Sequence, residues 1–123
     1  MARRWTDADA ERVRDRVGQI VARCPGVRIE DTHGHTGYRV RGRRFAWLLV
    51  DHHGDDRLAL CVKAPPGEQD ALVSADPERY FVPAYLGSRG WVGLSLAGAP
   101  EPDWDEVAEL LEQAWLLCTT KSG

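Results

Sequence analysis

Four arginines occur within one short predicted β-hairpin, and their side chains are well suited to binding anions. Arg39 and Arg41 alternate with apolar residues and therefore share one face, while Arg43 and Arg44 lie at the turn. The segment 37–50 contains no Asp or Glu. Because a guanidinium group pairs with two oxygens of a phosphate, this pattern predicts a phosphate-binding surface. The alternative is an edge hairpin whose charges keep it soluble.

The four histidines do not form a recognisable metal motif. His33 and His35 flank a glycine, and His52 and His53 are adjacent in a predicted turn. A structural zinc site needs four ligands, usually spaced C-x₂₋₄-C or H-x₃₋₅-H, and neither spacing occurs. We therefore expect no metal and no cofactor.

The chain also lacks the patterns of nucleophilic catalysis. It has no G-x-S-x-G motif, and the glycines of segment 87–90 lead into a predicted strand instead of the helix N-terminus that phosphate loops use. An active site would need His33, His35, Tyr85 and Arg89 to converge in one pocket, and nothing in the sequence indicates this. We therefore predict that the protein is not an enzyme.

The three cysteines, Cys24, Cys61 and Cys118, lie in apolar patterns without C-x-x-C spacing. Free cysteine behaves as a small hydrophobic residue. We therefore expect three buried thiols.

Charge is distributed unevenly along the 123 residues. The segment 1–50 has eleven Arg or Lys and six Asp or Glu, a balance of +5, whereas 51–123 has five and thirteen, a balance of −8. The molecule would therefore have a basic side and an acidic side if the two parts reach different faces. No apolar stretch approaches the ~20 residues of a membrane span, and the N-terminus shows no apolar leader, so a cytoplasmic location is expected.

The periodicity of apolar residues predicts a single α+β domain over 1–123. We expect a two-layer sandwich of order α-β₃-α-β₂-α, with an antiparallel five-stranded sheet and helices packed on one face, because the loops between early strands are too short for parallel crossovers. Segment 27–37 is interpreted as an extended, glycine-punctuated stretch. The expected elements are a helix from Thr6 to Cys24, strands at 38–41, 45–50 and 57–63, a short helix at 68–75, strands at 80–82 and 91–96, and a helix starting at Asp103.

Two segments resemble the signature segments of MmcQ/YjbR-like proteins. They are the run from His33 to Leu48 and the run from Pro83 to Val92. This resemblance implies a small cytoplasmic bacterial protein with an α-β₃-α-β₂-α fold related to secretion chaperones. It also implies DNA binding through two β-hairpin "wings", of which Tyr38 to Leu48 would be one.

We therefore predict a DNA-binding protein, with phosphates contacted by Arg39, Arg41, Arg43 and Arg44, together with Lys63 and Arg89. This requires the acidic 103–112 helix face to point away from the nucleic acid. The alternative is a protein-interaction module, either chaperone-like or homodimerising, in which a sheet edge or an apolar patch receives a peptide or a second copy.

Overall fold

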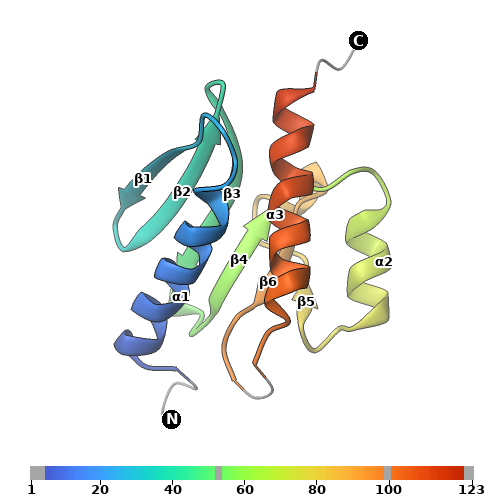
Figure 1. Ribbon diagram of the computed structural model, residues 1–123. Coiled ribbons are helices and arrows are strands. Elements are labelled where there is room, and N and C mark those ends of the chain that lie inside the picture. Colours follow the sequence, from blue (N-terminus) through green and yellow to red (C-terminus); the bar gives the residue numbers. More distant parts are fainter. Residues whose placement is uncertain (1–4, 52–53, 99–100, 121–123) are drawn as a thin grey trace.

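A computed structural model describes residues 5–51, 54–98 and 101–120. Three α-helices and six strands follow one another along the chain (Figure 1). The elements are α1 (Asp7–Val21), β1 (Arg28–Thr32), β2 (His35–Val40), β3 (Arg43–Val50), β4 (Leu58–Val62), α2 (Glu68–Ala75), β5 (Tyr80–Phe81), the 3-10 helix η2 (Gly87–Arg89), β6 (Val92–Ser95) and α3 (Trp104–Thr119).

The strands form one antiparallel sheet of order β1-β2-β3-β4-β6-β5. The α+β class is confirmed, but the prediction of five strands is wrong because β1 is a sixth. All five residues of β1 are exposed, so it lacks the alternation of apolar and polar residues that marks a half-buried strand. The sequence clue to β1 is the two-residue turn His33-Gly34 that follows it. Both residues have positive φ in the structure, as two-residue hairpin turns of type I′ require.

Two helices cover one face of the sheet, and both begin at the same end of the molecule (Figure 1). The helix starts expected at Thr6 and Asp103 are confirmed: Thr6 forms a capping box with Asp9 at the start of α1, and the Asp103 side chain accepts from two amides at the start of α3. The short helix α2 buries none of its residues and lies beside β5, at the edge of the sheet. The helices that pack on one face of the sheet are therefore α1 and α3.

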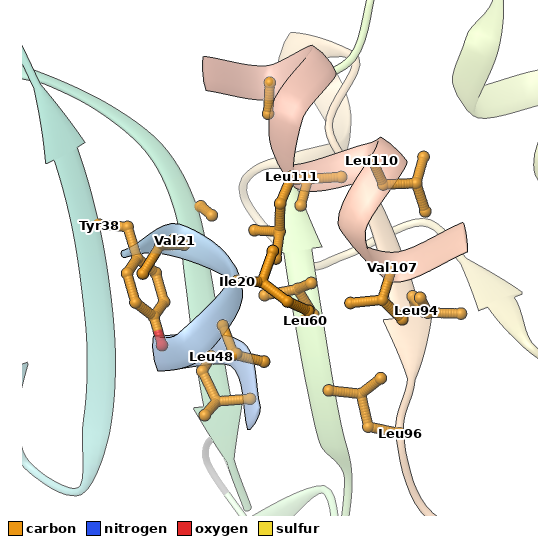
Figure 2. Packing of buried hydrophobic residues seen from close by; sticks show 14 of the residues in the cluster. Ile20, Val21, Tyr38, Leu48, Leu60, Leu94, Leu96, Val107, Leu110 and Leu111 are labelled. Atoms are coloured by element: carbon orange, nitrogen blue, oxygen red, sulfur yellow. The ribbon is translucent and has the colours of Figure 1, made fainter. Parts of the chain in front are cut away.

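The hydrophobic core lies between these two helices and the sheet (Figure 2). Leu48, Leu60 and Leu94 face one another on neighbouring strands and are at most 2% exposed. Val107 and Leu111 of α3 lie above them and are fully buried. This packing fixes the helices over the sheet, and no helix of the described residues covers the opposite face.

The opposite face is covered by its own side chains. A Cβ added at Gly93 would lie 2.4 to 2.7 Å from three ring atoms of Phe81, so this ring lies directly over the glycine. The guanidinium of Arg57 is in turn 3.9 Å from the ring centroid. Glycine is therefore used here to let a neighbouring ring cross the strand.

Candidate functional site

Basic side chains predominate at one end of the sheet and carboxylates at the other, where Arg57 and Arg79 also lie. At the end of the sheet where β1, β3 and β6 begin and β2 and β4 finish, the sequence places seven basic residues, and we call this the basic end: Arg28, Arg39, Arg41, Arg43, Arg44, Lys63 and Arg89. The other end of the sheet, together with the starts of α1 and α3, has many carboxylates: Asp7, Asp9, Asp31, Asp51, Asp55, Asp56, Asp103, Asp105 and Glu106. The positive charge of the first part of the sequence and the negative charge of the rest are thus found mainly at opposite ends of the sheet.

A groove of about 500 Å³ lies at the basic end and is lined by three of these arginines. Arg28, Arg39 and Arg41 surround it together with Glu30 and the glycines at 26 and 42. Arg28 and Arg39 face each other directly across β1 and β2. Two positive charges in facing positions destabilise a strand pair unless a negative charge lies between them.

Glu30 is the carboxylate that partly neutralises this groove. Its Oε1 lies 2.7 Å from Nε of Arg39 and 3.5 Å from Nη2 of Arg44. The Nε–H of Arg39 is not aligned with it as a hydrogen bond, however, and has no acceptor among the described residues. One carboxylate therefore serves several guanidinium groups, and the groove keeps a net positive charge.

Arg41 and Lys63 lie at the C-terminal turn of α3. Nη1 of Arg41 donates to the carbonyl of Thr119 at 2.8 Å, and Nζ of Lys63 lies 3.9 Å from Sγ of Cys118. The last carbonyls of a helix carry partial negative charge, so cations are favourable there. Part of the reason for basic residues at this end is thus structural, although Arg41 still has guanidinium hydrogens free for a ligand.

Arg43 and Arg44 are adjacent in sequence but have different environments. The side chain of Arg43 is exposed, and no hydrogen bond or ion pair joins that side chain to the described part of the chain. The side chain of Arg44 is only 17% exposed, and its guanidinium is stacked 4.0 Å from the ring centroid of Trp47. Burial, and secondly the charge of Arg39, lowers the pKa of Arg44.

Gly37 makes this stacking possible. A Cβ at that position would lie 1.8 Å from Nη1 of Arg44, so the guanidinium lies directly over the glycine of the neighbouring strand. The guanidinium of Arg44 therefore has a structural role on the sheet.

Arg89 belongs to η2 and is exposed just before β6. Along this end of the sheet, Lys63 follows β4, which lies between β3 and β6. Arg89 and Lys63 therefore extend the basic end away from the groove but do not line it.

The histidines do not join Tyr85 and Arg89. His33 lies in the β1–β2 turn and His35 begins β2, so both are at the end opposite η2. Nδ1 of His35 accepts a hydrogen bond from the backbone amide of Val50 at 3.0 Å, which gives it a local structural role. The pocket that an active site would need is therefore not formed by these four residues.

Among residues 5–51, 54–98 and 101–120, no group of His, Cys, Asp or Glu could hold a metal ion; His52 and His53 lie outside the described residues. Cys61 and Cys118 are buried as expected, whereas Cys24 is only partly buried because it follows the end of α1. Within the same ranges, no helix has the length and apolar character needed to cross a bilayer.

Sequence reasoning missed two residues of the groove, Arg28 and Glu30. Both belong to β1, which lies in the segment that was interpreted as an extended, glycine-punctuated stretch. The two-residue turn at His33-Gly34 could have revealed them, because it returns the chain antiparallel and brings 28 opposite 39.

Comparisons with known proteins agree with this architecture. A crystal structure of the Deinococcus radiodurans protein DR2400, whose domain has the family description DUF419, superposes with a TM-score of 0.72. The two chains are 20% identical over 89% of this chain and 80% of that one, a likeness that shows the shared fold. None of the curated proteins matches the chain. The family model described as YjbR matches residues 22–117, which include every strand and nearly all of α3, and the chain therefore belongs to the YjbR family.

Proposed function

We propose that this protein binds the phosphate backbone of nucleic acid at its basic end, with Arg28, Arg39 and Arg41 in the groove and Arg43 beside it. The observation that carries the proposal is the groove itself, where three guanidinium groups surround a single carboxylate. A guanidinium group pairs with two oxygens of a phosphate at once, so an anion is a suitable ligand for this site.

The acidic side chains in the first turn of α3 do not oppose this assignment. Asp105 and Thr119 are fourteen residues apart in the helix, which corresponds to about 21 Å along its axis. The Debye length at physiological ionic strength is about 8 Å. The carboxylates at the start of α3 are therefore screened from a phosphate that is bound near Arg41.

The number of available arginines gives a measurable salt dependence. If Arg28, Arg39, Arg41 and Arg43 each neutralise one phosphate of duplex DNA, log affinity falls with log salt at a slope of about −4, given about −0.9 per contact. We expect this slope in fluorescence-anisotropy titrations of a labelled duplex at several NaCl concentrations. A single-stranded oligonucleotide is expected to give a shallower slope, about −3, with the same four contacts.

Substitutions separate the groove from the rest of the surface. Arg28→Gln is expected to reduce the magnitude of the slope by about 0.9, because one phosphate contact is lost. Arg12→Gln is the matched control, since this exposed arginine on α1 pairs with Asp9. Absence of binding at the lowest salt concentration, or equal loss in both variants, would show that the groove is not a nucleic-acid site.

A further inference from the structure

β1 is an open edge of the sheet. It is the first strand in the sheet order and pairs only with β2 among the described strands. All five of its residues are exposed, and Ile29 is 52% exposed. The outward backbone N–H and C=O groups of such a strand can pair with a strand of another chain.

We infer that two copies of this protein pair antiparallel through β1, with Ile29 opposite Ile29 of the second copy. In this register Arg28 faces Glu30 of the second copy, and Glu30 faces Arg28 of the second copy. Residues directly opposite each other in an antiparallel pair project to the same face. The two sheets therefore join into one continuous sheet about a two-fold axis, with the helices of both copies on the same side.

The sequence of β1 favours this register over its neighbours. Centring the pair on Arg28, Glu30 or Asp31 would place two identical charges opposite each other. Centring it on Ile29 instead creates two pairs of opposite charge and covers an exposed apolar side chain at the axis. The charges of β1 thus disfavour pairing with unrelated strands and favour pairing with β1 of a second copy.

The separation of charge between the two ends of the domain also favours this antiparallel dimer. β1 begins at the basic end and finishes near Asp31 at the acidic end. Antiparallel pairing therefore brings the basic end of each copy beside the acidic end of the other, and complementary potentials favour association. This inference does not depend on nucleic-acid binding and can be tested without nucleic acid.

A pair of charge variants tests the register. In Arg28→Glu, position 28 would face Glu30 of an identical copy, and in Glu30→Arg, position 30 would face Arg28. Sedimentation velocity is expected to show a dimer for the parent protein and at least a roughly tenfold weaker dimer for each variant alone. An equimolar mixture of the two variants is expected to regain the dimer, because every facing pair again has opposite charges.

Far-UV circular dichroism of each variant serves as the folding control, since Glu30 also pairs with Arg39 within the chain. A parent protein that remains monomeric up to about 1 mM would overturn the inference. A parent dimer that Arg28→Glu leaves intact, or a mixture of folded variants that stays monomeric, would overturn it equally.

A cysteine cross-link gives a second measurement that does not alter charge. In a Cys24→Ser background, Ile29→Cys places two thiols directly opposite each other, with Cα atoms about 4.5–5.5 Å apart, which suits a disulfide. Thr32→Cys is the matched control on the same exposed strand, because position 32 of one copy is distant from position 32 of the other. We expect oxidation to produce a covalent dimer of the first variant only, and equal yields from both would contradict the register.

Discussion

Arg44 and Arg43 are neighbours in sequence, and substituting each one should affect a different property. Loss of Arg44 should lower the stability of the fold, and loss of Arg43 should weaken DNA binding. We consider Arg44→Gln and Arg43→Gln, which remove the same charge one residue apart. In the structure, Arg44 is stacked on Trp47 and also approaches Glu30, whereas Arg43 is exposed. The first substitution should therefore affect the fold and the second should affect the ligand.

The magnitude for Arg44→Gln follows from its contacts. A partly buried cation–π contact contributes about 0.5–2 kcal/mol, and a half-exposed ion pair such as that with Glu30 at 3.5 Å contributes about 0–1 kcal/mol. The cost of burying the guanidinium, which is also the main cause of its lowered pKa, offsets part of this sum. We therefore expect a loss of about 1–2 kcal/mol in the free energy of unfolding, compared with less than about 0.5 kcal/mol for the exposed Arg43.

The assays are urea unfolding, monitored by tryptophan fluorescence, and the DNA titration over a range of NaCl concentrations. Arg43→Gln should reduce the magnitude of the salt slope by about 0.9 and Arg44→Gln should leave it unchanged. The reasoning is refuted if Arg44→Gln is as stable as the parent, or if it lowers the slope as much as Arg43→Gln does. Either outcome would mean that the guanidinium of Arg44 is free to meet a phosphate.

Two further predictions concern the fold. Gly93→Ala should lower the free energy of unfolding by about 1–3 kcal/mol, because the new Cβ would displace the ring of Phe81. Gly18→Ala on α1 should raise it by about 0.5–1 kcal/mol, because its Cβ would meet no atom within 4 Å, and comparable urea midpoints for the two variants would contradict this explanation. Burial raises the pKa of Cys61 to about 12. Iodoacetamide at pH 8 should therefore modify the partly exposed Cys24 in the native protein and reach Cys61 only after unfolding. Rapid modification of Cys61 in the native protein, detected by mass spectrometry, would contradict its burial.

The sequence alone determined the elements whose signals are local. The apolar periods that follow Thr6 and Asp103 predicted two helices, and these are confirmed. The short helix at 68–75 begins and ends as predicted. These features depend on residues a few positions apart, which is the range over which capping and helical periodicity act.

Only the tertiary structure decided which charged residues share a surface. Arg28 and Arg39 become neighbours through the register of β1 and β2, and β1 has no apolar pattern of its own. Arg44 is covered because a glycine on the adjacent strand leaves room for its guanidinium. Strand pairing and cross-strand space join residues that are distant in sequence, so the composition of the hairpin indicated a basic surface, while the sheet determined which arginines on it are available to a ligand.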